Sequence, residues 1–266
     1  MKKLLSVVAA ALVALTFVGC DGLLQKDDTE GAIKGSGKKY TVEYNNESSD
    51  AYRAYKATTL KHAGALVKVT FDSEDVGTSK MGVIFDLKDA VSGVKDADGN
   101  VGRDFYCIGI GAGDKSYYVS KFTNIVDIQA KNFGATTTAT GNDPKEVEIV
   151  TWTQNNFTTL PAAAEDGTVS VYVYYKALTD GSFDYKILNI TDEVAKAFDL
   201  KTGTFDSSVI LFEGNTLAKA GAEFDACDEG KQPQNKVAFY AQIAAGKELK
   251  GSWNVIGTYL EAEDAE

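Results

Sequence analysis

The stretch CIGIGAGDKSYYVS, residues 107–120, places two strand-like segments on either side of a short polar turn. Before the turn, DFYCIGIG (104–111) is apolar and aromatic. After it, SYYVSKF (116–122) alternates in the manner of a strand. Such segments are typical of β-strands, and the glycines and aspartate between them suit a tight turn. The stretch therefore predicts a β-hairpin.

Residues 109–116, GIGAGDKS, also differ at only one position from the phosphate-binding loop G-x-x-x-x-G-K-[ST]. Asp114 stands where that loop needs a glycine, and its carboxylate would repel the phosphate. The lysine of the motif should also open a helix, but the residues that follow have a strand pattern. The same aspartate breaks the dinucleotide-binding motif, so we expect no nucleotide site here.

Similar short blocks recur along the chain, separated by turn residues. They include YTVEY (40–44), ALVKVTFD (65–72), MGVIFDLKD (81–89), TVSVYVYYKA (168–177) and KVAFYAQIAA (236–245). A parallel α/β sheet would need helices between its strands, and the sequence does not supply them. We predict an all-β fold, a two-sheet antiparallel sandwich, over residues 40–260.

One segment, TDEVAKAF (191–198), has a helical pattern. Thr191 can cap the helix, acidic residues follow in the first turn, and Val194 and Phe198 share one face. The fold class therefore includes one short helix.

The order of these blocks resembles the concanavalin A-like (laminin G-like) jelly rolls. The resemblance rests on MGVIFDL, DFYCIGIG and YYVSKFTN, on the later hairpin VSVYVYYKALTDGSFDYKILNI, and on KVAFYAQIAAGKELKGSW near the end. Val237 and Ala238 stand where that family usually has Gly-Val. The resemblance implies a jelly-roll sandwich, a fold often used to bind carbohydrate and sometimes to hydrolyse it.

The chain begins MKKLLSVVAAALVALTFVGC, with two lysines, an apolar run and a cysteine. The run is short for a membrane span, so residues 1–19 are predicted to be an export signal. Residues 20–39 are polar and glycine-containing and are predicted to be a flexible tether. The chain ends with an acidic tail, residues 261–266.

The segment LTFVGC (15–20) resembles the lipobox of bacterial lipoproteins, in which the cysteine is acylated and becomes the first mature residue. Phe17 departs from the usual leucine, and spirochaete lipoproteins are known for such looser lipoboxes. The resemblance implies a lipid anchor on Cys20 that holds the protein to a membrane of the cell envelope. We expect the outer membrane or cell surface, although Asp21 would retain a lipoprotein at the inner membrane under enterobacterial rules.

The charge of the chain limits its partners. The net charge is −11, and removal of Lys2 and Lys3 with the signal makes it −13, since residues 1–19 contain no acidic residue. Nucleic acids bind to clusters of lysine and arginine, so we expect no nucleic-acid partner.

Catalysis by a nucleophile has little support in the sequence. Cys107 would need a base, and His62 is the only histidine. A buried structural thiol is the preferred interpretation of Cys107. A disulfide between Cys107 and Cys227 stays open, because an exported protein could form one.

Two sets of acidic residues could carry other chemistry. Glu146 and Glu148 lie two apart on one predicted strand, and glycosidases need only two carboxylates. A solvated strand face is the preferred interpretation of this pair. Asp96, Asp98 and Asn100 offer oxygen ligands, but they lack the spacing of a calcium loop, so a polar turn is preferred and no cofactor is expected.

Aromatic residues are the remaining candidates for a binding site. In the segment 168–177 the valines alternate with Ser170, Tyr172, Tyr174 and Lys176, so the two tyrosines lie opposite the valine face. Exposed tyrosines can stack on sugar rings, whereas a covering helix or loop would bury them. We assign ligand binding to Tyr172 and Tyr174, and expect Trp152 and Trp253 to be buried.

These observations predict a lipid-anchored envelope protein that is not an enzyme and that binds a glycan or a host protein. The alternatives are a glycoside hydrolase that uses a carboxylate pair and a purely structural envelope lipoprotein.

Overall fold

The computed structural model describes residues 31–72, 74, 76–85, 103–113, 116–125, 145–150, 160–178, 182–215 and 235–259. The chain divides into two units, Met1–Gly31 and Ala32–Glu266, and all described helices and strands belong to the second. Cys20, Asp96, Asp98, Asn100, Trp152, Cys227 and the acidic tail lie outside the described residues. No helix within the described ranges is long and apolar enough to cross a membrane.

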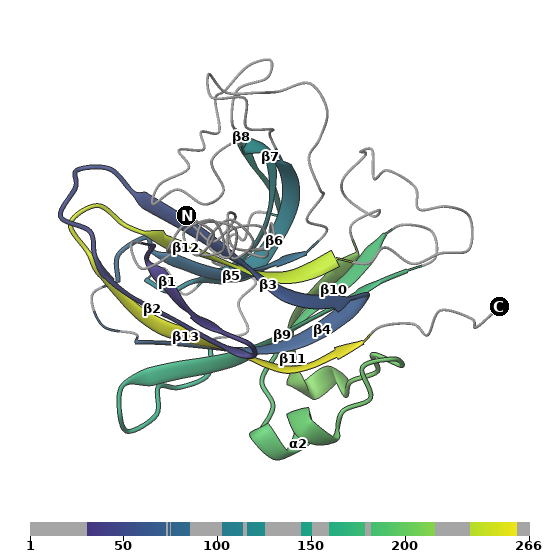
Figure 1. Ribbon diagram of the computed structural model, residues 1–266. Helices are drawn as coiled ribbons and strands as arrows, with labels where there is room; N and C mark the ends of the chain where they lie inside the picture. Colours follow the sequence, from purple (N-terminus) through teal and green to yellow (C-terminus); the bar gives the residue numbers. More distant parts are fainter. Residues whose placement is uncertain are drawn as a thin grey trace, which may run out of the picture. The chain divides into compact units, whose positions relative to one another are not determined.

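The described strands form two antiparallel sheets, which Figure 1 shows as two layers. The seven-stranded sheet has the spatial order β1 (Ile33–Ser36), β2 (Lys39–Asn45), β13 (Glu248–Tyr259), β4 (Gly64–Asp72), β9 (Thr168–Ala177), β10 (Phe183–Leu188) and β11 (Ile210–Asn215). The six-stranded sheet has the order β3 (Tyr52–His62), β12 (Asn235–Ile243), β5 (Lys80–Phe85), β6 (Arg103–Gly111), β7 (Ser116–Ile125) and β8 (Lys145–Val150). The predicted fold class, an all-β antiparallel two-sheet sandwich, is confirmed.

Strands that are distant in sequence lie side by side in both sheets. The last strand, β13, pairs with β2 on one edge and β4 on the other. In the six-stranded sheet β12 lies between β3 and β5. The C-terminal strands thus complete both sheets.

The core lies between the inner faces of the two sheets. Val67 and Val69 of β4, Val171 and Val173 of β9 and Trp253 of β13 are fully buried there, as the alternation in the sequence predicts. Aromatic rings of opposite sheets meet, with ring centroids 5.4 Å apart for Phe239 and Trp253. Large buried rings supply most of the apolar area that stabilises such a sandwich.

The hairpin predicted from residues 107–120 is present as β6 and β7, which pair in register from Gly111–Ser116 to Phe105–Phe122. Asp114 lies outside the described residues, but the strand that follows it, β7, stands where a phosphate-binding loop would have a helix.

The seven-stranded sheet begins earlier than the sequence indicates. Strand β1, Ile33–Ser36, lies inside the range 20–39 that was predicted as a tether. Ala32 and Ile33 are buried, and a turn at Gly37, whose φ is +61°, reverses the chain into β2. Only the left-handed conformation of Gly37 permits so tight a reversal between short polar strands.

The predicted helix forms as α2 (Asp192–Ala197), with Thr191 as its N-cap accepting a hydrogen bond from the Val194 amide at 3.3 Å. A single 3₁₀ turn, η3 (Ser207–Val209), precedes β11 within the described residues. The helix lies beside the seven-stranded sheet (Figure 1). Its inward residue is Ala195, which is 3% exposed, whereas Val194 is 49% exposed.

Candidate functional site

Tyr172 and Tyr174 of β9 are on the outer face of the seven-stranded sheet, as predicted, but they are 2% and 1% exposed. They form a small apolar cluster with Leu66, Leu188 and Ala195, which α2 and the segment after it complete. The prediction that the two rings are exposed for stacking is therefore wrong. The physical reason is that residues 190–205 bury their own apolar side chains on this part of the sheet.

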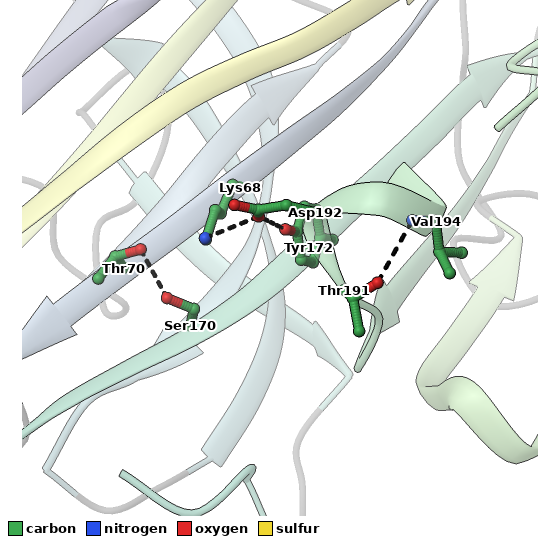
Figure 2. A network of polar contacts seen from close by, with 7 residues as sticks. All are labelled: Lys68, Thr70, Ser170, Tyr172, Thr191, Asp192 and Val194. Atoms are coloured by element: carbon green, nitrogen blue, oxygen red, sulfur yellow. Dashed lines mark hydrogen bonds and ion pairs between the residues drawn. The ribbon is translucent and has the colours of Figure 1, made fainter. Parts of the chain in front are cut away.

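The hydroxyl of each tyrosine is also occupied. Tyr172 donates to the carboxylate of Asp192, the first residue of α2 (Figure 2). Tyr174 donates to the backbone carbonyl of Leu200 at 3.2 Å, and its ring meets Phe205 edge-on with centroids 5.4 Å apart. Both side chains therefore hold the covering segment to the sheet and present neither ring nor hydroxyl to a ligand.

Asp192 joins three elements in one polar network (Figure 2). The Lys68 ammonium of β4 lies 2.8 Å from the Asp192 carboxylate, and Tyr172 of β9 donates to the same oxygen. The hydrogen bonds from Lys68 and then from Tyr172 lower the pKa of Asp192, while burial and the bond to Asp192 raise the pKa of Tyr172. Beside this network Thr70 and Ser170 bond across the strands at 2.8 Å. The network attaches α2 to the sheet and is structural.

The outer face of the six-stranded sheet is different in character. It carries an aromatic cluster, which we call the outer aromatic face, made of Tyr55, Phe105, Tyr118, Phe122 and Tyr240. Ring centroids of Phe105 and Phe122 are 4.8 Å apart, and those of Phe122 and Tyr240 are 5.1 Å apart. Tyr55 of β3 reaches Phe105 of β6 at 5.9 Å, although β12 and β5 lie between the two strands. The rings thus reach from β3 to β7.

Two glycines lie between the rings. The register aligns Tyr240, Gly82, Gly109 and Tyr118 across four neighbouring strands. A Cβ at Gly82 would meet the Tyr118 hydroxyl at 2.7 Å, so the tyrosine side chain of β7 reaches Gly82 of β5, two strands away. This is the geometry in which an aromatic ring covers strand positions that lack a side chain.

The outer aromatic face is buried at its centre and more open at one end. Phe105, Tyr118, Phe122 and Tyr240 are buried, whereas Tyr55 is half-buried. Beyond Tyr55, one register row contains Arg53 of β3, Gln242 of β12 and Lys80 of β5, which we call the rim row. Both cations of the rim row are half-buried. The sequence pattern gave no sign of this row, because its three residues are separated by long stretches of chain.

Pairing with β7 gives the positions of Glu146 and Glu148 in the six-stranded sheet. Glu148 of β8 is opposite Ser120, and Glu146 is opposite Phe122. Ser120 and Phe122 belong to the outer face with Cys107 and Phe105. Glu146 and Glu148 therefore occupy outer-face positions of β8, the edge strand next to the aromatic cluster.

The structure does not bring Cys107 and His62 together. Cys107 is buried on the outer face, with its sulfur 3.6 Å from the Tyr118 hydroxyl. His62 is buried against Tyr175 of the inner core, and its Nε2 bonds to the hydroxyl of that residue. The residues described in the structure contain no group of three or more His, Cys, Asp or Glu side chains that could hold a metal.

Comparison with known proteins finds a distant structural likeness. No family model and no curated protein matches the chain. The kappa-carrageenase of Pseudoalteromonas carrageenovora, solved with an oligotetrasaccharide of kappa-carrageenan, matches over 84% of this chain and 80% of its own, with 6% identity and a TM-score of 0.35. The prediction that the chain is not an enzyme is contradicted by this match to an enzyme, and we withdraw it. At this identity and TM-score the likeness assigns no activity, substrate or site residue.

Proposed function

We propose that the protein is an exported lipoprotein, anchored in the cell envelope by acyl chains on Cys20, whose β-sandwich binds carbohydrate. The export signal and the lipobox-like LTFVGC support the anchor. The binding surface is the open end of the outer aromatic face, formed by Tyr55 and the rim row. The outer membrane or cell surface is its proposed location.

The observation that carries the binding proposal is the half-buried ring of Tyr55 beside three polar side chains. Its ring is held against Phe105 at 5.9 Å, so its orientation is fixed before a ligand arrives. The neighbouring Arg53 and Gln242 bring hydrogen-bond donors to the same end of the face, and Lys80 of the same row extends its ammonium toward Tyr118. A flat apolar ring with a few convergent polar groups suits a sugar, which has an apolar ring face and a polar edge.

Binding can be tested with the protein lacking residues 1–19 and with Cys20 changed to Ser to prevent acylation. We expect it to bind polysaccharides on a glycan array, and Tyr55→Leu to lower the affinity about tenfold, because the stacking surface is lost. Tyr44→Leu is the matched control, since Tyr44 is a half-buried tyrosine of the seven-stranded sheet. Absence of any glycan binding by the unchanged protein, or equal binding by both variants, would contradict the proposal.

The lipid anchor has its own test. In its native cells the full-length protein should enter the detergent phase of a Triton X-114 separation, and Cys20→Ser should move it to the aqueous phase. Protease treatment of intact cells should cleave the anchored protein if it faces the outside. A wild-type protein that stays in the aqueous phase would contradict the anchor.

A second candidate function is glycoside hydrolysis. The observation that favours it is the placement of Glu146 and Glu148 at outer-face positions of the strand beside the aromatic cluster. Two carboxylates are the minimum that this chemistry needs. Release of reducing ends from a polysaccharide, abolished by Glu148→Gln and kept by Asp50→Asn, would establish it. Binding without any release would contradict it.

A further inference from the structure

The rim row crosses three neighbouring strands at the open end of the outer aromatic face. Gln242 pairs with Arg53 on one side and with Lys80 on the other. Neighbouring strands are about 4.8 Å apart, so the Cα atoms of Arg53 and Lys80 are separated by about 10 Å. Two cations thus flank one amide within a chain of net charge −11.

The amide of Gln242 is oriented by its own neighbour. The Tyr240 hydroxyl donates to the Gln242 Oε1 at 3.1 Å, which occupies the acceptor side of the amide. The Nε2 group of Gln242 can only donate. Arg53 and Lys80 are donors too, so a ligand at this row must supply acceptors.

The Lys80 ammonium lies over the outer aromatic face. It is 4.9 Å from the ring centroid of Tyr118 in β7, a strand separated from β3 by three others. The cation is thus held above the aromatic surface by its attraction to the ring. A ligand that extends across the sheet from Tyr55 toward β7 would contact the Lys80 ammonium.

We propose that the rim row selects an anionic polysaccharide and binds one of its sulfate or carboxylate groups at Arg53 and another at Lys80, with a sugar ring on Tyr55. This inference rests on the proposed carbohydrate binding and names its substrate class. The Arg53 guanidinium can bind two oxygens of one anionic group, Lys80 acts as a second cation, and the Gln242 amide donates to a neighbouring oxygen.

The experiment compares dextran sulfate, polygalacturonate and unmodified dextran as probes, by isothermal titration calorimetry on the chain without residues 1–19 and with Cys20→Ser. We expect binding to at least one of the two polyanions, which also tells whether sulfate or carboxylate is preferred, and at least tenfold weaker binding to dextran. Arg53→Gln and Lys80→Gln should each weaken binding about tenfold, and Lys80→Arg should retain it.

Lys39→Gln is the matched control, because it removes one charge from an exposed position of the seven-stranded sheet. Equal loss of affinity in Lys39→Gln, or none in Arg53→Gln and Lys80→Gln, would overturn the inference. Equal affinity for dextran and the polyanions would overturn it while leaving the proposed function in place. Binding to none of these probes, with neutral glycans bound on the array, would also overturn it. Thermal unfolding of each variant shows that a loss of binding is not a loss of fold.

Discussion

The indole nitrogen of Trp253 lies 3.0 Å from the carbonyl oxygen of Gly82 and donates a hydrogen bond from one sheet of the sandwich to the other. Trp253 is fully buried, and Phe239 stacks on its ring at 5.4 Å. A buried indole N–H needs an acceptor. Here the acceptor is the carbonyl of Gly82, the same β5 glycine that lies among the rings of the outer aromatic face. The inner core and the candidate binding face thus share β5.

Replacing Trp253 by Phe should lower the free energy of unfolding by about 2–4 kcal/mol. The change removes buried ring area and the inter-sheet hydrogen bond. Urea unfolding followed by circular dichroism measures the effect. Tyr44→Phe, at a half-buried position, should change the midpoint little. A Trp253→Phe midpoint no lower than that of Tyr44→Phe would contradict the importance of this contact.

Gly109→Ala should be strongly destabilising, by about 3 kcal/mol, because the new methyl group would lie 2.2 Å from the carbonyl oxygen of Met81. Backbone cannot move aside there without breaking the pairing of β5 and β6. Gly37→Ala is the control. The new methyl group would have open space there, and the only penalty is an alanine at positive φ, which destabilises the protein by about 1 kcal/mol. Equal unfolding midpoints for the two variants would contradict the close approach of β5 and β6.

Local patterns in the sequence predicted the strands but not the packing of distant segments. The alternation of residues 104–122 predicted the β6–β7 hairpin because period two is a local property of a strand. The same rule placed Tyr172 and Tyr174 opposite the valines of β9 correctly. It could not show that residues 190–205 return to cover them, because that packing joins segments distant in sequence.

The orientation of α2 has a similar cause. The sequence placed Val194 and Phe198 on one face, but Ala195 faces the sheet and Val194 is largely exposed. The contacts of Asp192 with Lys68 and Tyr172 hold the first turn of the helix in this orientation. The rim row was beyond prediction for the same reason, since only the pairing of β3, β12 and β5 assembles it.

Tyr172→Phe and Tyr174→Phe should each reduce stability by about 1 kcal/mol, because each removes a hydroxyl that holds the covering segment. If the hydroxyls act in separate contacts, the double variant should show the sum of the two losses. Neither change should alter glycan binding, since both rings are covered. A loss of binding in Tyr172→Phe or Tyr174→Phe, with stability kept, would return these residues to the ligand site.

The Asp192 network should make the free energy of unfolding depend on pH in the acidic range. Hydrogen bonds from Lys68 and Tyr172 lower the folded-state pKa of Asp192 below its ordinary value of 3.8. The contribution is therefore fully present above that value and is lost as the pH falls through the lower folded-state pKa. Since the Asp192 side chain is 48% exposed, solvent screening limits the contribution to about 0.5–1 kcal/mol.

Asp192→Asn should accordingly be less stable than the unchanged protein by a constant amount between pH 7 and pH 5, and the difference should shrink below about pH 4. Urea unfolding at each pH measures this difference. In a Lys68→Met background the largest cause of the pKa shift is gone, so both the difference and its dependence on pH should be smaller. The opposite result, with Lys68 present, is a difference in stability between Asp192→Asn and the unchanged protein that stays constant at low pH. That result would mean that the charge of Asp192 does not hold α2 to the sheet.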